Sequence, residues 1–468
     1  MWIRCRPGTG SSQAGGRPRA GCRPVSMGRL PEGSRHPARA HSCAGGTTSP
    51  GSLCARAGCG YHQDCEPSIA HPGGHPMNLS ASRLFHFRSP RSRVGAGSTS
   101  PLALVLLALP LALSCAPAAS AQAPELVFLS NITGTTDGDR VLTTIEEQTT
   151  ATLDALGMEL AGHGLGYEDV VAVNVFLRDT RHFQGMNGVY RTYFAENAPT
   201  RATVRADLPD VGALIQISAV ATPDDTEVIS PPGLQSPALP YSWGIRAGDV
   251  LFIAGATSRD PDTYQPVRGD VQVQTRRVFG NIGMILESAG MDYGDLVSCQ
   301  VFLDDVRLWG DMNEAYREFV TADDPPARAA VRGGLMNSDF LVEIQCIAEA
   351  SDARAVVRPA GQGPGRAPLS PAIDTGERLW LSGMLAAGED IPAETRNTLS
   401  RLNATLEAAE LDFSNVANVW VYLTDVRDAE AVLEVLGEVM PEGAPEPTVA
   451  GLPLVGRLGV EIQMMAVR

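Results

Sequence analysis

The sequence predicts an α+β fold that is repeated three times in tandem. Three similar stretches, in which Val, an aromatic residue and Leu stand before a final Asp, lie at positions 174–179, 300–305 and 420–425. They lie 126 and 120 residues apart, and each stands between two helix-like stretches. Self-similarity at a nearly fixed period indicates one supersecondary unit used several times, here with helices on one face of a sheet.

Each unit is expected to follow the order β-(β)-α-β-α-β-β. The first helices are predicted at 149–161, 273–289 and 395–409, and the second helices at 183–194, 308–319 and 429–440. Two closing strands follow in each unit, at 202–208 with 213–221, at 329–335 with 340–348, and at 448–452 with 459–467. The second and third units also open with strand pairs, at 241–245 with 250–255 and around 373 with 379–383.

Two joints rich in Pro and Gly separate the units, at 231–233 and 359–365. Stretches of this composition are typical of domain linkers. The predicted domains are therefore 122–229, 234–350 and 366–468.

The first 121 residues differ from the rest in charge. They contain thirteen Arg and three acidic residues, whereas the remainder contains 24 Arg and 50 acidic residues. The chain has no Lys, which excludes Schiff-base chemistry, pyridoxal-phosphate attachment and a P-loop lysine. The acidic remainder lacks the basic stripe that nucleic-acid surfaces require, so we expect no nucleic-acid partner.

Residues 1–76 form a low-complexity leader, either a disordered arm or an upstream extension that is not translated. Residues 77–121 hold a basic stretch, a short apolar run and a small-residue cleavage motif, the order of a secretory signal peptide. Cleavage after Ala121 would give a periplasmic or secreted protein without a stable membrane span. A lipoprotein anchored through Cys115 is the alternative, but the residues before it form a poor lipobox.

Two cysteines lie in the body of the chain, Cys299 and Cys346, and both stand in apolar strands. Burial as free thiols is the expectation for such residues. His163 and His182 do not combine with them at a recognisable zinc spacing, so we predict no metal.

Two strands of the second unit carry a lone charge among apolar residues, Arg328 in one and Glu343 in the other. The two side chains either pair with each other or face a pocket that binds a charged ligand. Loss of the pair from the first and third units, while the strand pattern persists, favours the pocket.

All three units, over residues 125–467, resemble the YjgF/RidA family, also known as the L-PSP endoribonuclease family, and the second unit does so most specifically. The residues that carry the resemblance are the stretches 301–305, 312–319, 326–328 and 342–348, and the first unit matches at 186–194 and 199–201. The resemblance implies a chorismate-mutase-like fold that trimerises around a central β-barrel, with ligand clefts between neighbouring subunits. It also implies hydrolysis of 2-imino acids to 2-keto acids and ammonia, without a cofactor.

The resemblance assigns a complete site to the second unit alone. Arg328 holds the substrate carboxylate there, and the other members are Glu343, Tyr241, Asn313 and Gly255. A planar Arg fork suits a carboxylate, Glu343 would relay protons, and the backbone at Gly255 can approach a ligand closely.

The first unit keeps Arg201 and Asn187 but has Gln216 at the glutamate position and Asn131 at the glycine position. Arg201 is therefore expected to bind a carboxylate without turnover, or to be structural.

The third unit keeps Glu461 and Gly383 but has Pro447 near the arginine position and Leu433 at the asparagine position. The sequence thus predicts an exported imine deaminase with one working site. The alternative is a non-catalytic protein that binds small carboxylates or acts as a scaffold; a ribonuclease is disfavoured by the acidic body. Three tandem units could form one monomeric pseudo-trimer.

Overall fold

The computed structural model describes residues 123–468, which lie within one compact unit. The predicted leader, signal peptide and cleavage site fall outside the described residues. Within residues 123–468 no helix is both long enough and apolar enough to cross a membrane.

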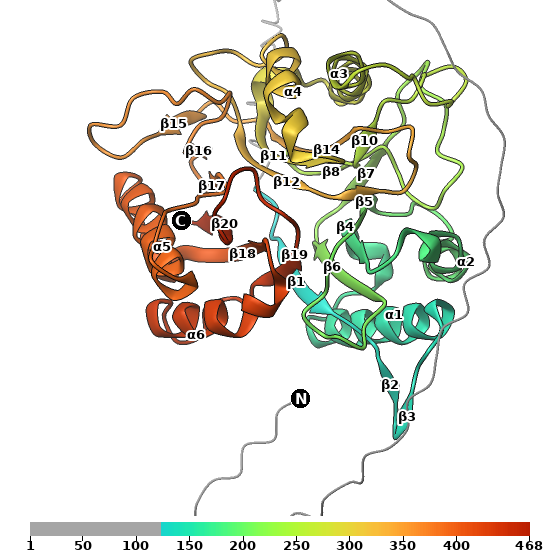
Figure 1. Ribbon diagram of the computed structural model, residues 1–468. Helices are drawn as coiled ribbons and strands as arrows, with labels where there is room; N and C mark the ends of the chain where they lie inside the picture. Colours follow the sequence, from blue (N-terminus) through green and yellow to red (C-terminus); the bar gives the residue numbers. More distant parts are fainter. Residues whose placement is uncertain (1–122) are drawn as a thin grey trace, which may run out of the picture. The chain divides into compact units, whose positions relative to one another are not determined.

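Three α+β copies follow one another along the chain (Figure 1). The first contains β1 (Val127–Ile132), α1 (Ile145–Gly162), β4 (Val170–Leu177), α2 (Phe183–Tyr193), β5 (Thr200–Arg205) and β6 (Ile215–Ala221), with a small hairpin of β2 (Thr136–Asp137) and β3 (Arg140–Val141). The second contains β8 (Gly244–Ala247), β9 (Val250–Ile253), β10 (Ala256–Thr257), α3 (Val271–Ser288), β11 (Leu296–Leu303), α4 (Trp309–Tyr316), β12 (Ala327–Arg332), β13 (Gly334–Leu335) and β14 (Val342–Glu349). The third contains β16 (Ala372–Asp374), β17 (Arg378–Leu381), α5 (Ile391–Ala408), β18 (Val416–Leu423), α6 (Ala429–Val439), β19 (Thr448–Gly451) and β20 (Val460–Val467). This order confirms the repeated α+β unit.

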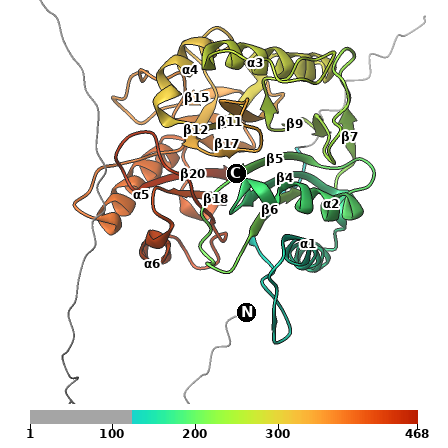
Figure 2. The same ribbon diagram turned by 45° about the vertical axis from the view of Figure 1, so that its right-hand side comes forward.

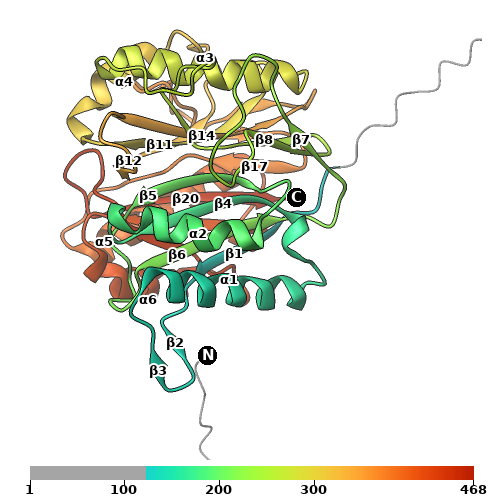
Figure 3. The same ribbon diagram turned by 90° about the vertical axis from the view of Figure 1, so that its right-hand side faces the viewer.

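The long first helix of each copy begins at a side-chain cap. Thr144 and Glu147 form a capping box at the start of α1, whereas Asp270 and Asp390 accept backbone N–H groups at the starts of α3 and α5. Such caps satisfy donors that the first turn of a helix leaves unpaired. Helices α1 and α2 lie together over one face of the first sheet, and α3 and α4 over the second (Figures 2 and 3).

The central strand of each copy is buried on both faces. In β4 every residue is buried; Val173 and Val175 pack toward the helices of the same copy. On the opposite face Phe176 packs in a cluster with Phe302 of β11 and Tyr422 of β18. The sheets of the three copies therefore contact one another through side chains, which explains the long apolar runs in the sequence.

The strands of residues 123–468 form three separate larger sheets and no closed barrel, so the predicted central barrel is wrong. Backbone pairing between copies is limited to short stretches: β13 pairs with β5 over two residues, and single bridges join Asp207 to Gly451 and Val331 to Leu454. The copies meet mainly through sheet faces, where side chains rather than backbone groups make the contacts.

The segment before each Pro- and Gly-rich joint pairs with the copy that follows. Strand β7 (Thr226–Ile229) pairs with β8, and β15 (Ala355–Val357) pairs with β16. Each joint is therefore enclosed between two paired strands.

Cys299 and Cys346 form a disulfide, which corrects the prediction of free thiols. The two residues stand directly opposite each other on β11 and β14, with Cα atoms 4.1 Å apart. Directly opposed residues in antiparallel strands come close enough for such a bond. The equivalent opposed pairs are Val173 with Ala219 in the first copy and Val419 with Met464 in the third.

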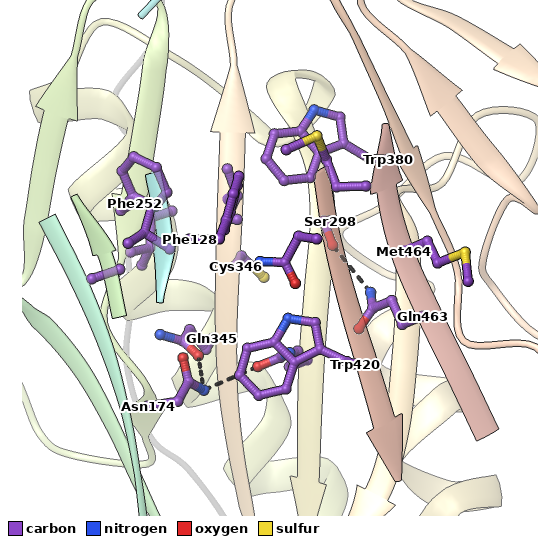
Figure 4. Close-up of a pocket in the computed structure, with 17 residues that line it drawn as sticks. Phe128, Asn174, Phe252, Ser298, Gln345, Cys346, Trp380, Trp420, Gln463 and Met464 are labelled. Atoms are coloured by element: carbon purple, nitrogen blue, oxygen red, sulfur yellow. Dashed lines mark hydrogen bonds between the residues drawn. The ribbon is translucent and has the colours of Figure 1, made fainter. Parts of the chain in front are cut away.

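A small cavity of about 80 Å³ lies where the three copies meet, and its side chains come from all of them (Figure 4). Asn174 donates to the amide oxygens of Gln345 (2.8 Å) and Gln300 (3.1 Å), and Gln463 donates to the Ser298 hydroxyl (3.3 Å). The volume is enough for only a few water molecules. These amides thus satisfy one another across the copies and fasten them together.

Candidate active site

The first site lies between the first and second copies and is built on Arg201 of β5. Arg201 is 4% exposed, and its Nη2 donates to Asn187 Oδ1 at 2.8 Å. The Cζ atom lies 4.7 Å from the centre of the Tyr190 ring. Nη1 has no hydrogen-bond partner among residues 123–468. A buried guanidinium with an unused donor is suited to an anionic ligand.

Glu343 of β14 supplies the acid of the first site. It is 6% exposed, and its carboxylate accepts the Thr203 N–H at 3.4 Å. Gly255 lies beneath it: a Cβ there would overlap the carboxylate and lie 3.0 Å from the Cα of Ala202. The Gly255 N–H donates to the Arg201 carbonyl at 3.1 Å, so it is not free to bind a ligand as predicted. The glycine is needed because two strands and a carboxylate meet at this point.

A cavity of about 480 Å³ joins these groups. Arg201, Glu343, Gly255 and Tyr241 all line it. The Tyr241 hydroxyl lies 2.7 Å from the Tyr264 hydroxyl, and the Tyr241 ring centre is 5.8 Å from the Arg201 guanidinium. Tyr241 therefore forms a wall of the site.

Burial controls the charge state of the first site. It raises the pKa of Glu343 to about 7, although the Thr203 N–H and the nearby Arg201 and Arg259 oppose the rise. Burial also lowers the pKa of Arg201, and it raises that of Tyr241 well above the usual value. A carboxyl group that titrates near neutrality can both accept and return a proton at physiological pH.

The second site lies between the second and third copies and is built on Arg328 of β12. Arg328 is 1% exposed, and its guanidinium lies 4.7 Å from the Tyr316 ring centre. Nε, Nη1 and Nη2 have no hydrogen-bond partner in the described part of the chain, and neither has the side-chain amide of Asn313. Burial lowers the pKa of Arg328 and raises that of Tyr316 to about 12.

Glu461 of β20 is the acid of the second site. Burial raises its pKa to about 8, against the opposing effects of Arg328 and the Ala330 N–H. Gly383 lies under its carboxylate, and the Gly383 N–H donates to the Arg328 carbonyl at 3.2 Å. The arrangement of arginine, glycine and glutamate thus repeats that of the first site.

The structure divides the predicted set between these two sites. Glu343, Tyr241 and Gly255 lie with Arg201, whereas Arg328 and Asn313 lie with Glu461 of the third copy. The predicted grouping of Arg328 with Glu343 in one site is therefore wrong. It fails because each site takes its arginine from one copy and its glutamate from the next.

The third interface, between the third and first copies, has no arginine–glutamate pair. Asn131 replaces the glycine, with φ of 53°, and its Oδ1 accepts the Val449 N–H at 2.9 Å. Its Nδ2 donates to the Pro447 carbonyl, and Gln216 donates to the Val449 carbonyl at 2.9 Å. We call Asn131, Gln216, Pro447 and Val449 the polar seam. The neutral amides of Asn131 and Gln216 fill it and satisfy backbone groups of the third copy.

Two tyrosines were missed from the sequence, Tyr190 and Tyr316, which face the two arginines. Each follows the asparagine of its site by three residues on one helix, a spacing that places both side chains on one face. The third copy has leucine at both positions, Leu433 and Leu436, and lacks the arginine. The loss of the tyrosine together with the asparagine and the arginine in the third copy was the sequence signal that could have identified the two tyrosines as site residues. Arg259 of the first site was also missed.

The family model "Endoribonuclease L-PSP" matches residues 118–223, 234–350 and 362–468. A RutC family protein of Pyrococcus horikoshii is 43% identical over 122 residues, covering 26% of this chain and 96% of that protein. Protein DfrA of Myxococcus xanthus is 37% identical over 111 residues, covering 23% of this chain and 84% of that protein.

Two solved structures were also similar. RidA of an Antarctic Psychrobacter is 29% identical, with a TM-score of 0.25, over 26% of this chain and 99% of that chain. A chorismatase is 14% identical, with a TM-score of 0.46, over 74% of this chain and 98% of that chain.

Proposed function

Because the chain belongs to the endoribonuclease L-PSP family, we propose that it hydrolyses small 2-imino or enamino acids to 2-keto acids and ammonia at the first site. One observation carries this proposal. Arg201, whose buried Nη1 has no hydrogen-bond partner among residues 123–468, and Glu343, whose pKa burial raises to about 7, line the same 480 Å³ cavity. A carboxylate held by Arg201 would bring its C=N carbon beside Glu343.

In the proposed reaction, water adds to C2 of the imino acid while Glu343 accepts a proton from it. Glu343 passes this proton to the nitrogen, so that the C=N double bond becomes a C–N single bond and a carbinolamine forms. Glu343 then accepts the proton of the new hydroxyl group and passes it to the nitrogen. The C–N bond breaks, ammonia leaves and the C=O bond of the keto acid forms. Proton transfer by a positioned group contributes roughly 10²–10⁴-fold. Arg201 keeps the carboxylate in place throughout.

The test is ammonia release from freshly generated 2-imino acids by the wild type and by Arg201→Ala. We expect Arg201→Ala to lower kcat/KM by about 10²-fold or more, since it removes the group that orients the substrate. The exposed Arg181 offers a matched control, and Arg181→Ala should retain wild-type activity. Wild-type release no faster than in buffer would refute deamination.

A second candidate function, binding of a small carboxylate without turnover, is favoured at the second site. All three guanidinium nitrogens of Arg328 lack a partner among residues 123–468, and Leu369 stands where the first site has Tyr241. A keto acid that raises Tm in the wild type but not in Arg328→Ala would support it, because a ligand stabilises the state it binds. Equal shifts in both proteins would count against it.

We also propose that the three copies form a pseudo-trimer within one chain. Contacts link the first copy to the second, the second to the third and the third to the first. Light scattering should then give the mass of a single chain. A stable trimer of chains at micromolar concentration would contradict this arrangement.

Export to the periplasm or medium is a further proposal. It is supported by the signal-like residues 77–121 and by the Cys299–Cys346 disulfide, since disulfides persist mainly in oxidising compartments. Fractionation followed by N-terminal sequencing should recover a chain that begins at Gln122. Recovery only from the cytosol would refute export.

A further inference from the structure

The cavity of the first site contains a second cation that the proposed reaction does not use. Arg259 lines it together with Arg201 and Glu343. Only one guanidinium is needed for the carboxylate that every 2-imino acid carries. The second therefore requires its own explanation.

The local structure holds Arg259 in place. Its Nη1 donates to the Tyr264 carbonyl at 3.0 Å, and its guanidinium lies 4.3 Å from the Tyr264 ring centre and 4.9 Å from that of Phe340. The Arg259 carbonyl accepts from Asn281 Nδ2 at 2.9 Å. Stacking on two rings fixes a guanidinium while its remaining N–H groups stay available.

No carboxylate of residues 123–468 forms an ion pair with Arg259, although the pKa of Glu343 responds to both arginines. The cavity thus holds two cations and a single acid that burial keeps largely protonated below neutral pH. A substrate with one carboxylate would neutralise only one of the two arginines. A substrate with two would neutralise both.

The second site offers an internal comparison. Gly383 of the second site is equivalent to Gly255 of the first. Four residues after these glycines stand Ala387 and Arg259, and fourteen residues before them stand Leu369 and Tyr241. The backbone contacts at the two glycines are equivalent. An arginine four residues after the glycine is therefore a property of the first site rather than of the repeated fold.

We propose that Arg259 makes the first site selective for 2-imino acids whose side chain ends in a second carboxylate. Arg201 binds the carboxylate next to the imine, and Arg259 binds the distal one. The inference rests on the proposed function for its chemistry, but it concerns recognition, which can be measured without turnover.

The test uses two keto acids of equal chain length as ligands, 2-oxopentanedioate and 2-oxopentanoate. The corresponding imino acids serve as substrates. An amino-acid oxidase generates them from glutamate and norvaline. In the wild type we expect kcat/KM for the dicarboxylic imino acid to exceed that for the monocarboxylic one by tenfold or more. Arg259→Gln should reduce this ratio at least tenfold, with Arg259→Lys intermediate because it keeps the charge without the fork.

The exposed Arg307 provides a charge-matched control, since it pairs only with its neighbour Asp305. Arg307→Gln should leave the ratio unchanged. A ratio within twofold of one in the wild type, or one that Arg259→Gln does not alter, overturns the inference. If Arg259→Gln does not fold, Arg259→Lys takes its place. A ratio of the two kcat/KM values in Arg259→Lys equal to that of the wild type then overturns the inference.

Thermal shifts separate this inference from the proposed reaction. Arg259-dependent stabilisation by 2-oxopentanedioate, larger than that by 2-oxopentanoate, supports the inference even if neither imino acid is turned over. Turnover of both imino acids with equal thermal shifts would uphold the reaction and overturn the selectivity.

Discussion

The first site and the polar seam occupy equivalent interfaces but are built in opposite ways. In the first site, the Thr203 N–H donates to a carboxylate that lies over a glycine. In the seam, the N–H of the equivalent residue, Val449, donates instead to the amide of Asn131. One interface leaves a buried cation with an unused donor; the other places neutral amides against the backbone of the third copy.

This difference shows which residues are needed to join two copies and which are better explained by ligand binding. The seam shows that this part of the interface can close without any charge, so the buried Arg201 and Glu343 are not required at the equivalent place between the first and second copies. Buried charges without direct ion pairs are costly. Their retention at two of three interfaces therefore favours a role in binding.

The largest expected loss of stability comes from removing the disulfide that holds β14, the strand that carries Glu343. The double variant Cys299→Val with Cys346→Ala installs the pair found at Val173 and Ala219 of the first copy. The disulfide spans 47 residues, and chain-entropy arguments give a stabilisation of about 4 kcal/mol for such a loop. Denaturant unfolding should show a loss of this order. Reduced wild-type protein serves as the control: if it is as stable as the oxidised form, the crosslink contributes nothing.

A second exchange replaces the acid of the first site with the amide of the seam. Burial raises the pKa of Glu343 from 4.5 to about 7, so the folded state favours the neutral form. The resulting penalty is absent below pH 4.5, grows as pH rises from 4.5 to 7 and is then constant. Glu343→Gln, the residue type of Gln216, should thus be more stable than wild type at pH 8 by up to about 3 kcal/mol.

The difference in Tm between Glu343→Gln and wild type should vanish near pH 4.5. The same variant should lose turnover by roughly 10²–10⁴-fold, since the amide cannot exchange protons. A variant that is less stable than wild type at pH 8 would show that the carboxylate stabilises the interface, contrary to the comparison.

The reverse exchange places the glycine of the sites in the seam. Asn131→Gly should cost about 1–3 kcal/mol, because Val449 N–H and Gln216 lose a buried partner. Asn131→Ala should cost about 1–2 kcal/mol more, since φ is 53° at this position and alanine is strained there. Equal unfolding free energies for the two variants would contradict this account.

Much of the fold could be predicted from the sequence because each copy repeats its pattern of helices and strands. Ranges such as 183–194 for α2 (Phe183–Tyr193) and 459–467 for β20 (Val460–Val467) agree closely with the structure. The residue types of the sites were also visible. What could not be predicted was their grouping, because patterns within one copy do not show which side chain a neighbouring copy supplies to Arg328.

The disulfide was missed for a related reason. The sequence pattern placed Cys299 and Cys346 in apolar strands, but strand pairing and its register decide whether two residues stand opposite each other. The disulfide and the grouping of each arginine with its glutamate both depend on contacts between segments that are distant in sequence.

The division of each site between two copies also has an evolutionary consequence. In an assembly of identical subunits, one substitution alters every interface at once. In this chain Pro447 and Asn131 changed one interface, while Arg201 and Arg328 were kept at the other two. Tandem duplication thus allows each interface to diverge on its own, so that one can become purely structural while the other two acquire different ligand preferences.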